Sequence, residues 1–132
     1  MADCSDLLID ATILVRGIRQ NEIRDGKVKK SAFIPRKNGK DDDGLSVSEL
    51  RSDARESLEE RVKSSDGCYC KLSACDIRKK EQNFPGLDVC PSPTVMDPYH
   101  ALIKGVPTGV SPAERGAATR LAELLADISV PL

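Results

Sequence analysis

The chain has 132 residues, of which 39% are hydrophobic and 3% aromatic, and its 20 basic and 21 acidic residues leave a formal charge of −1. This length suits one domain with a single core and is short for two. Nucleic-acid surfaces rely on clustered cations or stacking aromatic rings, so the balanced charge and the absence of tryptophan disfavour a nucleic-acid partner.

The N-terminus and the cysteines indicate a cellular compartment. Residues 1–10 are acidic and lack the basic and long apolar regions of a secretory signal, and no window has the roughly 20 apolar residues of a membrane span. We therefore expect a cytoplasmic protein without a membrane partner. The five cysteines are odd in number, and a reducing cytosol disfavours disulfides, so we expect most of them to be free thiols.

The first half of the chain predicts strands joined by turns. Residues 1–10 fit either a short helical turn or a flexible tail. Residues 11–18 are apolar and β-branched, which predicts a strand covered on both faces. The Asp25-Gly26 pair is typical of a hairpin turn. Ala32–Ile34 predicts a short or edge strand, because Pro35 removes a backbone donor.

A charged stretch follows. Residues 36–44 contain basic residues, three consecutive aspartates and two glycines, which predicts an exposed loop before a strand at Leu45. The three aspartates resemble a cation site, but they lack the spacing of a calcium loop, and a soluble charge run is the alternative. We then expect a helix capped by Ser48 and ending near Lys63, with one narrow apolar stripe.

The second half of the chain predicts further strands and a final helix. Residues 68–77 predict a strand, and shorter strands are expected at 87–90 and 99–106. Ser111, Pro112 and Glu114 combine a capping serine, a first-turn proline and the glutamate of a capping box. Strands and helices in this order predict an α+β fold, with a small, mostly antiparallel sheet and two helices in a single domain over residues 1–132.

Two groups of residues carry candidate chemistry. Cys68, Cys70, Cys75, Cys90 and His100 offer zinc ligands, but the spacing departs from that of zinc knuckles, so buried thiols remain the alternative and we assign no metal. A thiol hydrolase uses a nucleophilic cysteine, a histidine base and a carboxylate that orients the histidine. The chain offers these residue types as Cys75 or Cys90, His100 and Asp97. Because His100 is the sole histidine, any histidine-dependent chemistry must use it.

Arg16 lies within an apolar strand, where a charge is costly unless it is paired or faces a cleft. One interpretation brings Arg16, Ser46 and His100 together in a pocket at strand ends. The other is an arginine at a sheet edge whose head reaches water.

The segments ILVRGIRQ, SAFIPR, DGLSVS, LDVCPSP and DPYHALIKGVP resemble a group of short, uncharacterised bacterial proteins. In that group an Arg-Ile start and Ser-x-Ala-Phe, Gly-Leu-Ser-Val and Pro-x-His-Ala segments recur in this order. The resemblance covers residues 13 to 106 and implies no activity. The matching positions, which form our candidate binding pocket, are Arg16, Ser31, Phe33, Ser46 and His100.

A second likeness is to ADP-ribosyltransferases, which set an arginine on an early strand, a serine on a later strand and a glutamate near the end around NAD. Arg16 and Ser46 match the first two places. No glutamate falls on a late predicted strand, since Glu114 and Glu123 belong to the final helix.

Two hypotheses follow. The first is a non-enzymatic bacterial accessory protein that needs no cofactor and binds another protein, or a second copy of itself, by pairing at a strand edge near Phe33 to Pro35 and through the 36–44 loop. The second is a small nucleotide- or NAD-dependent transferase using Arg16 and Ser46, with the Cys/His hydrolase as a further alternative. These hypotheses differ in whether Arg16, Ser46 and His100 converge on one concave pocket. If the three residues are scattered, the enzyme hypotheses fail.

Overall fold

The computed structural model describes residues 4–35, 44–51, 55–64, 66–107 and 111–132. Its strands are β1 (Ile13–Ile18), β2 (Ile23–Arg24), β3 (Lys27–Val28), β4 (Leu45–Glu49), β5 (Cys68–Ser73), β6 (Asp88–Pro91), β7 (His100–Lys104) and β8 (Val130–Pro131). Its α-helices are α1 (Cys4–Leu7), α2 (Arg55–Arg61), α3 (Ala74–Lys79) and α4 (Pro112–Ile128), and its 3₁₀ turns are η1 (Gln20–Glu22), η2 (Lys30–Phe33) and η3 (Lys80–Gln82).

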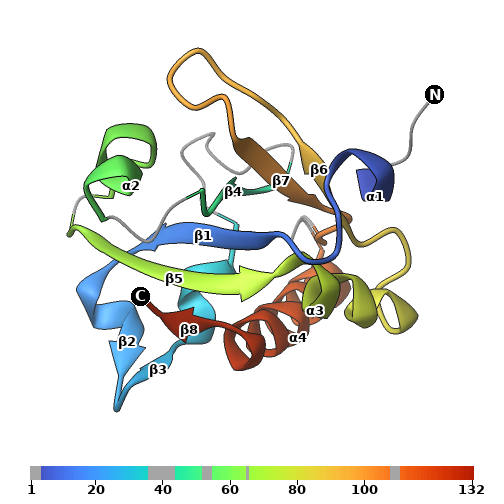
Figure 1. The fold of residues 1–132 in the computed structure, drawn as a ribbon. Coiled ribbons are helices and arrows are strands. Elements are labelled where there is room, and N and C mark those ends of the chain that lie inside the picture. The colour runs from blue at the N-terminus through green and yellow to red at the C-terminus, as the bar shows by residue number, and fades with distance from the viewer. Residues whose placement is uncertain (1–3, 36–43, 52–54, 65, 108–110) are drawn as a thin grey trace.

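Six strands form one sheet in the order β6-β7-β4-β1-β5-β8 (Figure 1), and β2 and β3 form a separate hairpin. All the paired strands are antiparallel. The expected α+β fold with a mostly antiparallel sheet is therefore confirmed. The two longest of the described helices are α2 and α4, with seven and 17 residues.

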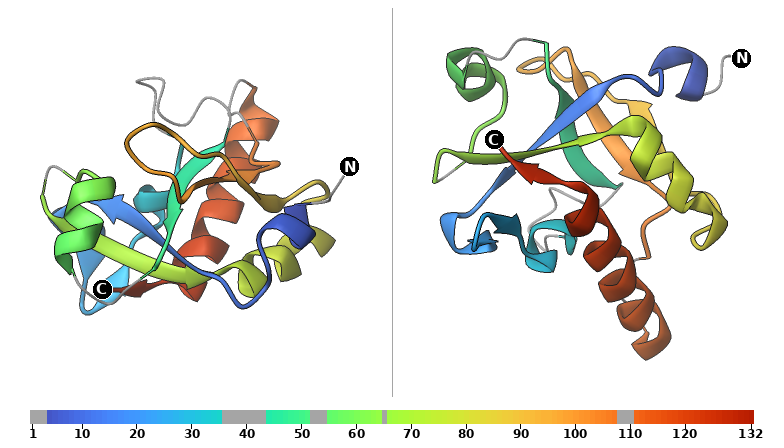
Figure 2. Two further views of the ribbon diagram at one scale, coloured as in Figure 1. Left: turned by 45° about the horizontal axis from the view of Figure 1, so that its top comes forward. Right: turned by 60° about the horizontal axis from the view of Figure 1, so that its bottom comes forward.

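The main core lies between one face of the sheet and α4. This helix crosses below the sheet in Figure 1, and its whole length is visible in Figure 2. Alternate residues of each strand share this face, as the pleat requires. The core contains Leu14 and Ile18 from β1 and Leu121 and Leu125 from α4. We call this side of the sheet the core face.

The opposite side of the sheet, here the outer face, carries a smaller apolar cluster beneath α2. Val15 of β1 and Tyr69 of β5 pack there against Leu58 of α2. Outward-pointing residues of β4 and β7 share this face, because Val15 pairs with Ser48 and Ser48 with His100. The narrow apolar stripe expected on the first long helix thus packs, through Leu58, against the outer face of the sheet.

Two local predictions are confirmed. Asp25 and Gly26 have φ angles of 54° and 74° and connect β2 to β3, as expected for a hairpin turn whose two central residues are left-handed. At the start of α4, the Ser111 hydroxyl accepts a hydrogen bond from the Glu114 amide at 3.2 Å, and Pro112 occupies the first turn.

The strand predicted at Ala32–Ile34 is wrong. Ala32 and Phe33 belong to η2, and both are 1% exposed. Consecutive residues of a strand point to opposite faces, so a strand cannot place two neighbours in one core, whereas a helical turn can. There is accordingly no strand edge at Phe33 to Pro35 for a partner to pair with.

Two predicted boundaries also need correction. Ser48 does not cap a helix, because β4 continues to Glu49 and buries Ser48 completely; the described helix begins at Arg55. The strand expected over residues 68–77 ends at Ser73, whose side chain accepts a hydrogen bond from the Asp76 amide at 3.1 Å and so starts α3. At Ser48 sheet pairing prevailed over the local capping signal, whereas at Ser73 the capping serine ended the strand.

The remaining expectations concern the chain's ends and loops. Of the two alternatives for residues 1–10, a helical turn, α1, is present. The predicted loop at 36–44 lies outside the described residues except for Gly44.

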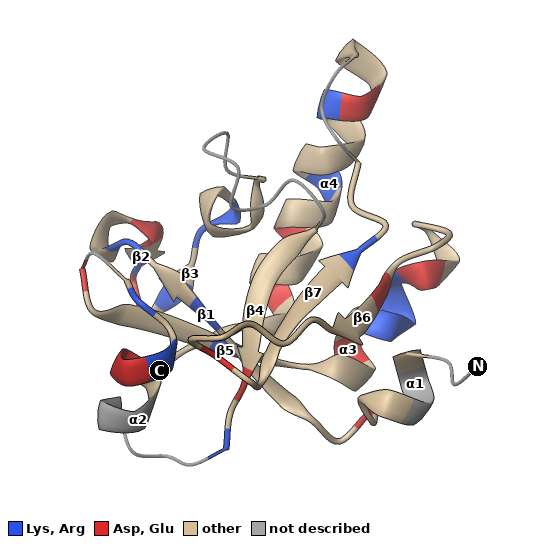
Figure 3. Cartoon of the chain, turned by 90° about the horizontal axis from the view of Figure 1, so that it is seen from above, with Lys and Arg blue, Asp and Glu red and all other residues tan. Residues whose placement is uncertain are grey.

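Basic and acidic residues are interspersed over strand ends, loops and helices (Figure 3). Within the described ranges, no helix has both the length and the apolar character needed to cross a membrane.

Candidate functional site

Arg16 is buried on the core face and ties three segments together. Its Nε donates to the Ala32 carbonyl oxygen at 2.6 Å, and its Nη1 donates to the Ser46 carbonyl oxygen at 2.8 Å. The guanidinium carbon lies 5.9 Å from the centre of the Phe33 ring. With 1% of its surface exposed, Arg16 holds η2 and β4 against β1.

The five predicted pocket residues are therefore separated. Arg16 and Phe33 meet in the core, and Ser31 is exposed on η2. Ser46 and His100 line a pocket on the outer face. Ser46 reaches Arg16 through its carbonyl oxygen, so the sheet lies between the Arg16 guanidinium and the Ser46 and His100 side chains.

The pocket on the outer face has a volume of about 220 Å³. It lies where the end of α2 and the residues after it approach β1, β4 and the loop that joins β6 to β7. The lining residues are Gly17, Ser46, Val47, Arg61, Val62, Lys63, Thr94, Asp97 and His100. We call this the Asp97 pocket.

A buried ion pair forms one wall of the Asp97 pocket. Arg61 Nη1 lies 3.1 Å from Asp97 Oδ1, and the two side chains are 12% and 4% exposed. The same nitrogen donates to the Ser48 hydroxyl at 2.5 Å, and Nη2 donates to the Glu49 carbonyl oxygen at 3.1 Å. The Arg61 guanidinium also stacks 5.3 Å from the centre of the Tyr99 ring. Arg61 is thus well supplied with partners.

Asp97 is less completely satisfied. Its Oδ1 accepts hydrogen bonds from Arg61 and from the Tyr99 amide, the latter at 3.0 Å. Its Oδ2 is buried, and none of the described residues donates to it. An orphaned buried carboxylate oxygen is uncommon in folded proteins and needs a donor to offset its lost hydration. Asp97, which lines the pocket, therefore has one carboxylate oxygen without a donor among the described residues.

His100 has a defined tautomer. Its Nδ1 lies 2.8 Å from the Ser92 carbonyl oxygen, which can only accept, so Nδ1 carries a proton, and in the neutral imidazole Nε2 is an acceptor. The ring is oriented by a backbone carbonyl. Asp97, proposed as its orienting carboxylate in the hydrolase hypothesis, contacts His100 through its own carbonyl oxygen instead, which accepts from the His100 amide at 3.2 Å.

The cysteines divide into one bonded pair and three thiols. Cys4 and Cys90 form a disulfide that joins α1 to β6, whereas Cys68, Cys70 and Cys75 are thiols outside any disulfide. Cys70 is fully buried in the main core. The pairing of Cys90 removes one thiolate from both the proposed zinc set and the proposed hydrolase.

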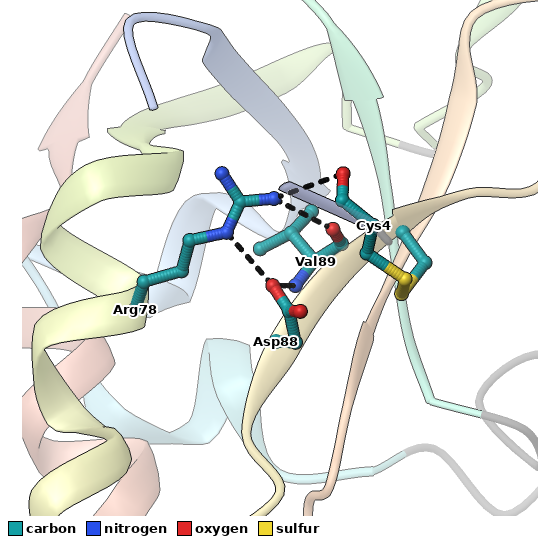
Figure 4. The surroundings of a disulfide bond; sticks show 5 residues. Cys4, Arg78, Asp88 and Val89 are labelled. Atoms are coloured by element: carbon teal, nitrogen blue, oxygen red, sulfur yellow. Dashed lines mark hydrogen bonds and ion pairs between the residues drawn. A yellow bond between two sulfur atoms is a disulfide. The ribbon is translucent and has the colours of Figure 1, made fainter. Parts of the chain in front are cut away.

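Arg78 organises the surroundings of the disulfide (Figure 4). Its Nε donates to Asp88 at 2.7 Å, and its Nη2 donates to the carbonyl oxygens of Cys4 and Val89 at 3.3 and 3.0 Å. Nη1 donates to Asp10 at 2.7 Å. Burial disfavours the charge of Arg78, but the hydrogen bonds to Asp88 and Asp10 outweigh it and raise the pKa of the guanidinium.

One further group of potential metal ligands occurs in the described part of the chain. Ligand atoms of Cys4, Asp88 and Cys90 lie within 4.8 Å of one another. Metals bind thiolates, and here the two sulfur atoms are bonded to each other, while Asp88 already accepts from Arg78. This geometry fits a disulfide that attaches α1 to β6 better than it fits a metal centre.

Sequence reasoning missed the pairing of Arg61 with Asp97. Arg61 had the pattern of a solvent-exposed helix residue, and Asp97 precedes Pro98 as many turn residues do. The sequence carries no signal that joins two residues 36 positions apart. No known protein family, curated protein or solved structure matches this chain.

Proposed function

We propose that this chain is a non-catalytic interaction protein that presents the loop between β6 and β7 to a partner protein. The observation that carries the proposal is the tip of this loop, where Val95 is 100% exposed and Met96 is 68% exposed. The loop projects beyond the sheet in Figure 1. Two neighbouring apolar side chains at a projecting tip are typical anchors for a pocket on another protein.

The loop is held rigidly, which strengthens this argument. Across the tip, the Thr94 amide donates to the Asp97 carbonyl oxygen at 2.9 Å, and the Asp97 amide donates to the Thr94 hydroxyl at 2.9 Å. At its base the Ser92 amide donates to the His100 carbonyl oxygen at 2.8 Å. A preorganised loop loses little conformational entropy on binding, so burial of Val95 and Met96 would contribute most of its roughly 3–5 kcal/mol to affinity.

The sheet edges offer less to a partner. At one edge, β8 has two residues, one of them Pro131, which has no amide hydrogen to donate. At the other edge, α1 packs beside β6 and is bonded to it through Cys4 and Cys90. We therefore propose that recognition uses the loop tip. The sequence indicates a bacterial cytoplasmic protein, whereas the Cys4–Cys90 disulfide favours an oxidising compartment.

The transferase alternative has no comparable support. It needs the Arg16 guanidinium and the Ser46 side chain in one cleft, but Arg16 is occupied in the core by the carbonyl oxygens of Ala32 and Ser46. The Asp97 pocket, at about 220 Å³, is also smaller than the sites that hold drug-sized ligands, and NAD is larger still.

Site-specific photocrosslinking in the native host tests the proposal. A benzophenone amino acid replaces Val95 in one variant and, as a matched control, Val130 in another, because Val130 is also an exposed apolar residue, with 53% of its surface accessible. We expect one discrete crosslinked protein from position 95 and none from position 130. A product at twice the chain's mass would mean that the partner is a second copy. Equal crosslinking from both positions, or none from position 95, would contradict the proposal.

A further inference from the structure

The Asp97 pocket lies beside the loop tip but has a different chemical character. Two of its lining residues carry acceptor atoms: Asp97 Oδ2, to which no described residue donates, and His100 Nε2, which is an acceptor in the neutral imidazole whose Nδ1 donates to Ser92. Both require a hydrogen-bond donor. None of the described residues donates to Oδ2, so a bound molecule with a donor group would complete the site.

The charge balance indicates what kind of donor fits. Asp97 is already neutralised by Arg61 at 3.1 Å, in a pair that is almost fully buried. An ammonium or guanidinium group entering the pocket would lie close to the positive charge of Arg61. It would lose its hydration without gaining an unpaired carboxylate. A neutral hydroxyl donates equally well and avoids this repulsion. The part of the pocket beside Asp97 therefore favours hydroxyl groups.

The rim of the pocket favours a negatively charged group instead. Lys63 lines the pocket and is exposed, and it has no ion pair within the described part of the chain. An ammonium at the mouth of a partly enclosed site attracts an anionic group without a large desolvation cost. A ligand that spans the pocket would thus place its charge near Lys63 and its hydroxyl groups toward Asp97.

The size of the pocket limits the ligand. A volume of about 220 Å³ corresponds to about seven water molecules at roughly 30 Å³ each. That space suits a molecule of about ten non-hydrogen atoms. Asp97 Oδ2 is covered by its surroundings, so contact requires a small rotation of the carboxylate, and the terminal torsion of aspartate is broad enough to allow it.

We infer that the Asp97 pocket binds a small hydroxylated anion, with hydroxyl groups donating to Asp97 Oδ2 and His100 Nε2 and the anionic group beside Lys63. This inference is independent of the proposed partner protein, because it uses the pocket and not the apolar tip. It assigns the pocket a binding role and no reaction.

Three probes separate the parts of this inference. Glycerol 3-phosphate carries both alcohol hydroxyl groups and charge, inorganic phosphate carries charge but no alcohol hydroxyl group, and glycerol carries only alcohol hydroxyl groups. Binding of each to the intact chain is measured by amide chemical-shift titration. We expect glycerol 3-phosphate to bind at least about tenfold more tightly than either of the others, since each charge-assisted hydrogen bond contributes about that factor. The largest shifts should fall at Ser46, Lys63, Thr94 and His100.

Variants assign the contacts. Asp97→Asn keeps an oxygen for Arg61 but replaces Oδ2 with a donor, so it should weaken glycerol 3-phosphate about tenfold and leave phosphate unchanged. Lys63→Gln changes an exposed residue, so the fold is preserved, and it should weaken glycerol 3-phosphate and phosphate alike while leaving glycerol unchanged. Lys27→Gln, an exposed lysine on β3, is the matched control and should change none of the three affinities.

Several results would overturn the inference. Equal affinities for glycerol 3-phosphate and phosphate would reveal an adventitious ion only. Shifts confined to residues outside the pocket would place the binding elsewhere. If Asp97→Asn does not fold, Lys63→Gln still decides: unchanged affinity for glycerol 3-phosphate in this variant would refute the assignment.

Discussion

Arg16 and Ser46 are joined by a 2.8 Å hydrogen bond, yet it runs from the Arg16 side chain to the Ser46 backbone, and their side chains belong to opposite faces of the sheet. Arg16 contacts Phe33 in the main core, whereas Ser46 lines the Asp97 pocket. The two residues that suggested a common catalytic cleft therefore have separate roles. Arg16 is a structural cation, and its function can be tested by stability.

Replacing Arg16 with methionine should destabilise the protein by about 2–4 kcal/mol. The apolar side chain fills similar space, but the carbonyl oxygens of Ala32 and Ser46 lose a charged donor inside the protein. Urea unfolding followed by circular dichroism measures the loss. The control is Arg24→Met, because Arg24 is exposed on β2 and its replacement should change the free energy of unfolding by less than about 0.5 kcal/mol. Similar losses in both variants would show that Arg16 has no special role.

A double-mutant cycle should find Arg61 and Asp97 strongly coupled. Asp97→Ala leaves a mostly buried guanidinium without its carboxylate and should cost about 3 kcal/mol, with a coupling energy of about 1–3 kcal/mol to Arg61→Met. The matched pair is Arg51 and Glu49, 3.6 Å apart and 55% and 25% exposed. Its coupling energy should stay below about 1 kcal/mol and shrink in 1 M salt. Equal coupling in the two cycles would mean that burial of the first pair has no energetic consequence.

Local signals in the sequence predicted much of the fold. The hairpin at Asp25-Gly26 and the start of α4 at Ser111 each depend on a few neighbouring residues, whose preferred torsion angles and hydrogen bonds act without the rest of the chain. The prediction at Phe33 failed because its neighbour Ala32 is buried in the same core as Phe33, which a local pattern cannot reveal. The order of strands in the sheet was equally beyond local reasoning.

The candidate site was less accessible than the fold. Ser46, His100 and Asp97 were singled out and do line one pocket, although Asp97 was expected to orient His100, whereas Arg61 and Lys63 were assigned to a surface helix. Their meeting depends on α2 lying over the outer face while the loop between β6 and β7 folds back toward it. Such contacts join segments that are 36 residues apart, and neither composition nor periodicity encodes them.

Loss of the Cys4–Cys90 disulfide should reduce stability by about 4 kcal/mol. The bond closes a loop of 86 residues in the unfolded chain, and release of such a loop raises the entropy of the unfolded state. Urea unfolding of a Cys4→Ser, Cys90→Ser variant measures the effect, which reductant should reproduce in the unmodified protein. Cys75→Ser is the control, because Cys75 is a free, partly exposed thiol and its replacement should leave the response to reductant intact. Titration of five reactive thiols in the unreduced, unfolded chain would contradict the disulfide.

Gly105 should be far less replaceable than Gly26, although both have left-handed φ angles, of 84° and 74°. A Cβ at Gly105 would collide with the Gly86 carbonyl group and lie 2.7 Å from the Leu87 amide nitrogen, whereas a Cβ at Gly26 meets nothing within 4 Å. Gly26→Ala therefore carries only the backbone strain, about 1 kcal/mol, while Gly105→Ala adds a clash with backbone that must move, for a total of about 3 kcal/mol.

Thermal and urea unfolding of the two glycine variants measure this difference. The clash occurs where the chain leaves β7 beside the entry to β6, so Gly105→Ala should also perturb amide shifts along both strands, and Gly26→Ala should perturb only the β2–β3 hairpin. Because the strain is the same in kind at both positions, the excess cost isolates the close approach of Gly105 to Gly86. If the two substitutions cost the same, the two backbone segments do not approach each other this closely, and the pairing of β6 with β7 ends before Lys104.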